Sequence, residues 1–386
     1  MAEADTGGAH SAVSRQHLVA ALRRDFSLGE RVDWRSHDPY DLLLSPFARR
    51  IPQISPLAAR VFVQLGRRSG ANIRRLLRVP LHEEPKTLAD FLRAAVILGN
   101  LGDGWSVEHI SRLSRRLRDR AVATPTGHAW GNAFPQASRF VAAPADEPNI
   151  YTTTAACDAL LAEYEFVGGE ESLEAASLGA TFILRDLGTF THEGRHWLRY
   201  FRGRDSPIVN VQASAASLFA RLGRIQSNEE LLETADRAAE TVVSAQRDDG
   251  SWSYSTDGRG EFVDGFHTGF TLQGLVEYGT LRDSSAAVRI DETVETGFAY
   301  FKEHLLTPDG RPCAFADGAA SRDAQTLAQA IQSLVICGTG PDTSLAARIW
   351  RAAEDALQRE RFLALRWNHA PFALATANLV AAVAAS

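Results

Sequence analysis

The chain has 386 residues, 45% of them hydrophobic, with 41 Lys or Arg, 47 Asp or Glu and a net charge of −6. This apolar content suffices for a large core, and the mildly acidic net charge argues against a nucleic-acid-binding protein, which would show a basic stripe. The polar N-terminus, three cysteines without ligand-like spacing and the absence of a run near ~18 apolar residues predict a cytoplasmic protein with no transmembrane segment.

The N-terminal part predicts little regular structure. Residues 1–30 indicate a flexible tail up to Ser14 and a short helix over His17–Asp25, followed by a single domain over residues 31–386. Residues 32–52 are irregular, with several Pro and Asp. Residues 57–78 have apolar residues at helical spacing and many arginines, so they predict a helix or a helix pair.

The next two segments predict a helical pair over residues 86–100 and 106–122. Ser106 is suited to cap the second helix. A full capping box would need Glu or Gln three positions later, and His109 stands there instead.

From residue 151 onward the chain repeats with a period of roughly 56–58 residues, the mark of a repeat architecture. In each unit one helix is amphipathic and the other is apolar or small on nearly all sides, which predicts an outer and an inner position respectively. The expected outer helices cover 172–187, 229–246, 289–306 and 344–360, and the expected inner helices cover 151–166, 209–223, 265–279, 322–338 and 370–385.

The links from outer to inner helices are long and contain Gly and aromatic residues, whereas the return links are short. Long links of this kind are usually functional. We therefore expect an all-α fold, an α/α toroid of five to six helical hairpins, with its long loops gathered at one mouth. The alternative is an open solenoid of helix pairs, whose repeats are usually shorter, about 34–47 residues.

Asp264 and His267 form the sharpest local cluster. They stand three residues apart at the start of an expected inner helix, so they share one helix face. A carboxylate placed there can hold an imidazole in one tautomer for proton transfer, which makes both residues candidate catalytic groups. The simpler alternative is that Asp264 caps the helix and His267 is an interior histidine.

Candidate substrate-binding residues come from the long links. Trp252 and Tyr254 are flanked by turn residues and suit stacking on a sugar ring, although they could instead clamp their own loop. Trp130, Asn132 and Arg139 precede another inner helix, and Arg139 could pair with a carboxylate or phosphate. Comparable mouth positions in the chain hold Tyr151, Arg199, Asn210, Asp323 and Trp367.

Other chemical signatures are absent from the sequence. It has no phosphate-binding Gly-rich loop, no Cys/His set at zinc spacing and no nucleophile elbow, so no cofactor and no metal is expected. A glycosidase needs two carboxyl groups about 5–10 Å apart. Asp264, Asp317 and Asp323 are possible members, but the sequence does not give their separation.

Several segments resemble the VpsJ-like polysaccharide-biosynthesis proteins, from about residue 33 to residue 278. They are Asp38-PYDLLLSPF, His128-AWGNAFPQASRF, the helix of Asn210, and 246–275 with its Asp-x-Phe-His-Thr-Gly-Phe signature. That family is similar to six-hairpin α/α toroid proteins, which include glycosidases, polysaccharide lyases and sugar epimerases. The resemblance matches its motif positions to Trp130, Asn132, Trp252, Asp264 and His267.

The chain departs from this family at Gly265, where many members have Asn, so a ligand contact made by that Asn would be missing. Residues 246–252 also resemble the Gln–Trp repeat of triterpene cyclases, but the acidic protonation motif of those enzymes is absent.

These observations predict a carbohydrate-active enzyme of surface polysaccharide or glycan biosynthesis. It would use acid/base chemistry of glycosidase, lyase or epimerase type on a carbohydrate or lipid-linked sugar. The alternatives are a non-catalytic scaffold that binds a glycan or a protein partner, and, less favoured, a terpene-cyclase-like enzyme. The sequence does not predict an oligomeric state.

Overall fold

A computed structural model describes residues 13–103, 105–282, 285–360 and 362–385. Within them, six inner helices form a closed ring in which each helix contacts the next and the last contacts the first. They are α5 (Pro85–Asn100), α7 (Ile150–Val167), α9 (Val209–Gln226), α11 (Gly265–Leu281), α13 (Ala324–Cys337) and α15 (Ala370–Ala385). The chain is therefore an α/α toroid, and the open solenoid is wrong.

Six outer helices surround this ring, each packed on one inner helix. They are α1 (Arg15–Arg31), α6 (Val107–Asp119), α8 (Glu170–Thr181), α10 (Glu229–Ser244), α12 (Ser285–His304) and α14 (Gly340–Arg359). The sequence placed the two helix classes correctly, because the amphipathic helices lie outside and the apolar ones inside.

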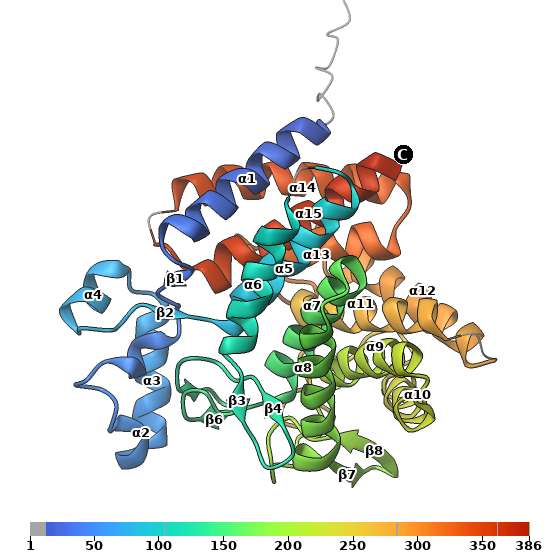
Figure 1. The fold of residues 1–386 in the computed structure, drawn as a ribbon, viewed down its shortest axis with the longest axis horizontal. Helices are drawn as coiled ribbons and strands as arrows, with labels where there is room; N and C mark the ends of the chain where they lie inside the picture. Colours follow the sequence, from blue (N-terminus) through green and yellow to red (C-terminus); the bar gives the residue numbers. More distant parts are fainter. Residues whose placement is uncertain (1–12, 104, 283–284, 361, 386) are drawn as a thin grey trace, which may run out of the picture.

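The sixth hairpin joins the two ends of the chain (Figure 1), because α1 packs along α15. The expected short helix at 17–25 is longer, and its Leu18, Leu22 and Phe26 are buried in the main core. This helix therefore belongs to the ring instead of preceding the domain. The expected tail falls mostly on residues 1–12, outside the described residues.

Local capping fixes where the helices begin. Ser106 Oγ accepts the His109 N–H, Asn149 Oδ1 accepts the Thr152 N–H, and Asp323 Oδ1 accepts the Thr326 N–H. Each contact satisfies one of the free N–H groups of a first helical turn. Ser106 also contacts the His109 ring nitrogen Nδ1 at 2.6 Å, so histidine here interacts with the cap without completing a capping box.

Close packing of the inner helices depends on small residues. A Cβ atom added to Gly274 of α11 would lie 2.6 Å from the backbone carbon of Ala213 in α9. A Cβ added to Gly269 would lie 2.5 Å from the Gln329 side chain in α13. Glycine at these positions lets α11 approach both neighbours, which helps to close the ring.

The long links contain short antiparallel strand pairs at the mouth end. They are β1 (Arg35–Ser36) with β2 (His82–Glu83), β3 (Val122–Ala123) with β4 (His128–Ala129), β5 (Gln136–Ala137) with β6 (Ala142–Ala143), and β7 (Thr189–His192) with β8 (Arg195–Leu198). The β7–β8 turn has positive φ at both Glu193 and Gly194, as a two-residue type I′ hairpin turn requires. The links also contain two π-helical turns. Phe182–Leu187 follows α8 directly, and Leu365–His369 leads directly into α15.

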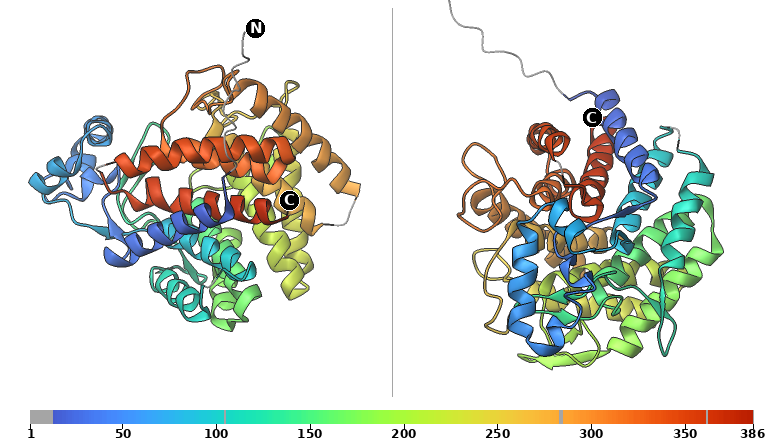
Figure 2. Two further views of the ribbon diagram at one scale, coloured as in Figure 1. Left: turned by 90° about the horizontal axis from the view of Figure 1, so that it is seen from above. Right: turned by 90° about the vertical axis from the view of Figure 1, so that its left-hand side faces the viewer.

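The link between α1 and α5 is the longest departure from the ring. It contains a 3₁₀ turn (Asp41–Leu44), α2 (Ile51–Ile54), α3 (Pro56–Arg67) and α4 (Ala71–Leu76). Figure 2 shows these helices standing out to one side of the ring. They have a small core of their own, which includes Leu43 and Val63.

Candidate active site

The mouth is formed where the inner helices begin, and Asp264 and His267 lie together there on the first turn of α11. Oδ1 of Asp264 accepts the backbone N–H of His267 at 2.7 Å, and its Oδ2 lies 2.7 Å from Nδ1 of the imidazole. One carboxylate therefore caps the helix and holds the ring. The His267 side chain is 29% exposed, and its Nε2 has no hydrogen-bond partner among the described residues.

Aromatic rings surround this pair. The ring centroid of Tyr254 lies 4.5 Å from that of His267, Phe266 lies at 5.2 Å and Phe262 at 6.4 Å. The cluster continues through Phe140, Phe315, Phe270 and Tyr151. Such ring faces and edges suit an apolar sugar face, so the mouth combines an imidazole with stacking surfaces.

Three tyrosines near the mouth remain protonated. Burial raises the pKa of Tyr254, and the neighbouring Asp264 carboxylate raises it further. Burial likewise raises the pKa of Tyr200 and of Tyr151, and Tyr254 adds to the effect on Tyr200. Neutral phenols are hydrogen-bond donors, so these groups can donate to an anionic or hydroxyl oxygen.

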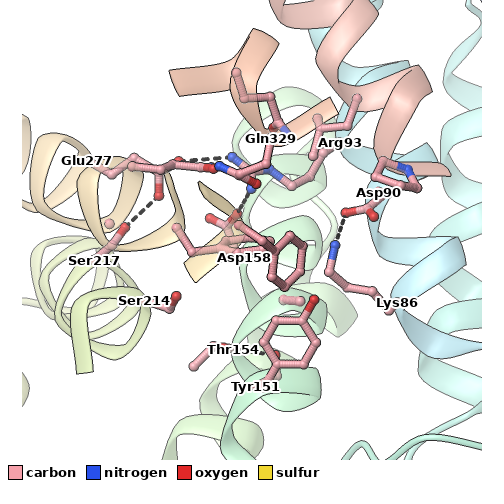
Figure 3. Close-up of a pocket in the computed structure, with 18 of the residues that line it drawn as sticks. Lys86, Asp90, Arg93, Tyr151, Thr154, Asp158, Ser214, Ser217, Glu277 and Gln329 are labelled. Carbon is pink, nitrogen blue, oxygen red and sulfur yellow. Dashed lines mark hydrogen bonds and ion pairs between the residues drawn. The ribbon is translucent and has the colours of Figure 1, made fainter. Parts of the chain in front are cut away.

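A narrow polar cavity lies at the centre of the ring (Figure 3). Its volume is about 60 Å³, which holds a few water molecules and is too small for a sugar ring. Phe266 and Phe270 line this cavity, whereas His267 does not.

The charges around the cavity pair with one another. Nη1 of Arg93 lies 2.8 Å from Asp158, and its Nη2 lies 3.0 Å from Glu277. Arg221 contacts Asp158 at 2.6 Å, and Ser217 donates to Glu277 at 2.9 Å. We call these five residues the central network. It links α5, α7, α9 and α11 through charge-assisted hydrogen bonds.

Arg93 and Arg221 determine how Asp158 titrates. Burial alone would raise the pKa of this carboxyl, but the two guanidinium groups outweigh that effect and lower it. Asp158 is therefore a structural anion at neutral pH and is unsuited to act as a proton donor.

Three buried side chains that line the cavity keep polar atoms without a protein partner in the described structure. These atoms are Oδ2 of Asp90, Oε1 of Gln273 and Nε2 of Gln329. Lys86 pairs with Asp90 and also lines the cavity. The cavity can therefore hydrogen-bond small polar molecules.

The two expected stacking tryptophans are not in the mouth surface. Trp130 is fully buried and donates its indole N–H to the carbonyl of Leu117 at 2.8 Å. Trp252 is 2% exposed, and its indole donates to the carbonyl of Val242 at 3.0 Å. Both indoles fill the core between inner and outer helices, so stacking on a ligand is corrected to a packing role. The alternative of a self-clamped loop fits Trp252.

The remaining binding candidates differ in availability. Asn132 is buried and contacts Thr152. Asn210 is buried, and its Oδ1 has no partner in the described ranges of the chain. Arg199 is paired with Asp205 at 2.7 Å. Arg139 is exposed and lies 5.0 Å over the ring of Phe140, so it borders the aromatic cluster.

Asp323 and Trp367 form a separate pair next to the mouth. The indole N–H of Trp367 donates to Oδ2 of Asp323 at 2.9 Å, while Oδ1 caps α13. The ring of Trp367 lies 5.1 Å from that of Tyr40. Asp317 contacts His304 at 2.9 Å. Each carboxyl proposed for a glycosidase pair, Asp264 included, therefore already holds a protein partner.

Of the residues that line the central cavity, the sequence analysis selected Tyr151 and missed the charged ones. A signal was present, because Lys86, Asp90, Arg93, Asp158 and Glu277 are charged residues within helices that are otherwise apolar. Lys86 and Asp90 stand four residues apart, the spacing of an ion pair on one helix face. Ion pairs between different helices, such as the one from Arg93 to Glu277, form only because the ring brings those helices together. They therefore leave no local pattern in the sequence.

No family model matches the chain, and no curated protein matches its sequence. Solved structures do share the fold. One is a cellobiose 2-epimerase from Bacillus thermoamylovorans (10% identity, TM-score 0.58, covering 88% of each chain). A second is a GH76 alpha-mannanase from Bacteroides thetaiotaomicron (12%, 0.59, 80% of this chain and 88% of that one). A third is an unsaturated glucuronyl hydrolase specific for heparin (12%, 0.58, 96% and 97%). At these identities the likeness establishes the α/α toroid fold alone.

Proposed function

We propose that this protein is a carbohydrate-active enzyme that transfers protons with His267 in the toroid mouth. The observation that carries the proposal is the 2.7 Å contact between Asp264 Oδ2 and His267 Nδ1, while Nε2 has no hydrogen-bond partner among the residues that the structure describes. The solved structures of the same fold include enzymes that act on sugars, which supports a sugar as the substrate.

The geometry favours one type of proton transfer. A carboxylate that accepts Nδ1–H leaves the Nε2 lone pair of neutral His267 as a base, and it stabilises the imidazolium that forms. Both oxygens of Asp264 are occupied, so it does not act as one of two free carboxyls of a glycosidase. We therefore favour removal of a C–H proton beside a carbonyl or carboxyl group, as in a lyase or an epimerase.

The substrate is proposed to lie across the aromatic cluster, with Tyr254 and Phe262 against the sugar and Arg139 at the rim. A role in surface-polysaccharide biosynthesis, with a sugar chain or lipid-linked sugar as substrate, rests on the VpsJ-like resemblance. A glycan-binding scaffold is the second candidate. It would use the same aromatic surface, but it would not depend on the His267 imidazole.

A panel of three sugars tests the proposal. The protein is incubated with cellobiose, with α-mannan oligosaccharides and with heparin chains. Epimerisation is followed by NMR, hydrolysis by released reducing ends, and formation of a C=C bond by ultraviolet absorbance. Turnover of any sugar is expected to fall by about 10²–10⁴-fold in His267→Gln, because the base is lost.

Asp342→Asn is the matched control, since it alters another carboxylate that caps a helix, here the outer helix α14, and holds no histidine. It is expected to keep its activity. Turnover that survives in folded His267→Gln would contradict the catalytic role. Sugar binding by calorimetry that His267→Gln leaves unchanged, with no turnover of any sugar, would favour the scaffold.

A further inference from the structure

The link between α1 and α5 has a charge unlike that of the rest of the chain. Residues 42–81, which we call the α2–α4 lobe, contain no Asp and no Glu. They contain the arginines 49, 50, 60, 67, 68, 74, 75 and 78. A strongly basic segment in a chain of net charge −6 indicates a surface for an anionic partner.

Most of these arginines form no ion pair with the residues that the structure describes. Arg74 is the exception, because it is buried and its Nε contacts Asp41 at 2.7 Å. Arg49, Arg50, Arg68 and Arg75 are exposed, and none forms an ion pair with a described residue. Their charges are therefore available to a partner.

The same lobe exposes a row of large apolar side chains. Leu57, Val61 and Leu65 of α3 are 68%, 53% and 64% exposed, and their spacing of four residues places them along one helix face. Ile54, just before them, is 81% exposed. Phe47, Ile73, Leu76 and Leu81 are also exposed, so the lobe holds all the exposed large apolar side chains of the described residues except Val107 and Phe315.

The outward face is not a sign of poor folding, because the opposite face of α3 is packed. Ala59 and Val63 of α3 are 1% and 2% exposed and contact Leu43 and Ala48 in the small core of the lobe. The Arg74–Asp41 pair joins α4 to the preceding 3₁₀ turn. The lobe is thus a folded unit with one covered face and one face that no described residue covers.

We propose that the α2–α4 lobe docks on the surface of an anionic lipid bilayer. An amphipathic helix with apolar side chains on one face and arginines beside them lies in the plane of a membrane interface, where anionic headgroups attract the basic residues. A second copy of this chain does not fit the lobe as well, since a two-fold interface would place the arginines of one lobe against those of the other.

Docking through the lobe would bring the mouth close to the membrane. The lobe belongs to a mouth link, and α3 contacts β5, which belongs to the next mouth link. The ring itself would remain outside the bilayer, and no described helix is long and apolar enough to cross one. This inference goes beyond the proposed enzyme activity and does not depend on it.

Sedimentation with vesicles tests the inference on the full chain without any sugar. The protein is mixed with vesicles of phosphatidylcholine alone or of phosphatidylcholine with phosphatidylglycerol. Binding to the anionic vesicles is expected at low ionic strength and should weaken as salt is added. The double variant Arg49→Gln/Arg50→Gln should bind about thirtyfold less tightly, since each basic residue at an anionic surface contributes about fivefold. Leu57→Ser should also bind the anionic vesicles less tightly. Because this variant loses an apolar side chain and no charge, its loss of affinity relative to the parent protein should not depend on the salt concentration.

Matched controls lie on α6, where Arg112→Gln/Arg115→Gln removes two exposed arginines and Val107→Ser removes a side chain that is 50% exposed. Both should bind vesicles like the parent protein. Circular dichroism should show all variants folded, because each change is at an exposed residue.

Four outcomes would overturn the proposal. The first is no binding of the parent protein to anionic vesicles at low ionic strength. The second is an equal loss of binding in the lobe and control doubles. The third is a dimer in sedimentation velocity that Leu57→Ser abolishes without any vesicle binding, which would assign the lobe to a second copy. Soluble polyglutamate bound in place of vesicles would assign it to acidic proteins and would equally overturn the proposal.

Discussion

The Asp264–His267 pair in the mouth and the central network are both built from polar side chains of the inner helices. They differ in whether the outermost side-chain nitrogens have a partner among the described residues. In the mouth, Asp264 holds one nitrogen of His267, and the other nitrogen has no partner within the described part of the chain. At the centre, Arg93 lies between Asp158 and Glu277, so each of its contacts links two helices. The comparison indicates that the first group is equipped for proton transfer and the second for holding the ring together.

Asp264→Asn should show the difference between the two sites most strongly. Asparagine still caps a helix, so the thermal stability of the protein should change little. The negative charge that stabilises the His267 imidazolium is lost, and turnover of whichever sugar is a substrate should fall by about 10²–10⁴-fold. Steady-state kinetics beside a thermal melt would check this. A parallel loss of stability and activity would mean that the carboxylate is mainly structural.

At the centre the opposite pattern is expected. Asp158→Asn leaves the guanidinium groups of Arg93 and Arg221 with one carboxylate fewer, and breaking a buried ion pair in this way costs about 3 kcal/mol of unfolding free energy. Urea unfolding would measure it. A variant as stable as the parent protein would show that the central network does not hold the ring.

The pH dependence of the unfolding free energy should differ between the parent protein and Asp158→Asn. The pKa of Asp158 is lowered in the folded state, so its contribution is present above its ordinary value of 3.8 and is lost as the pH falls through the folded value. The parent protein should therefore lose unfolding free energy below about pH 4 more steeply than Asp158→Asn. Parallel curves would contradict this linkage.

A smaller effect should come from packing between α9 and α11. In Gly274→Ala the new methyl group would press on the backbone of Ala213, at an expected cost of about 1–3 kcal/mol. Gly279→Ala in the same helix is the matched control, because its Cβ would contact only Ile290 at 3.4 Å. That substitution should stabilise by up to about 1 kcal/mol through helix propensity. Equal urea midpoints for the two variants would contradict the close approach.

Much of the ring could be predicted from the sequence because its signals are local. The repeat, the contrast between amphipathic and apolar helices, and cap residues such as Ser106 and Asp264 each act within a few residues. The closure of the ring by α1 could not be predicted, since the match between α1 and α15 joins segments at opposite ends of the chain. For the same reason the sequence predicts five to six hairpins and not one definite number.

The candidate site was predicted less well. The Asp264–His267 contact follows from spacing on one helical turn, so the sequence could indicate it, and whether that contact serves catalysis stays a prediction. Trp130 and Trp252 lie in links rich in turn residues, which suggested exposure. The structure instead inserts both indoles between helices, and only tertiary packing determines that choice.

The pairing of α1 with α15 also sets an order for the synthesis of the protein. The apolar residues of α1, such as Leu22 and Phe26, are made well before residues 370–385, which form their partner helix. A nascent chain therefore carries an unfinished ring until α15 leaves the ribosome, and contacts so distant in sequence form slowly. Throughout that interval the apolar face of α1 is a place where the growing chain can aggregate.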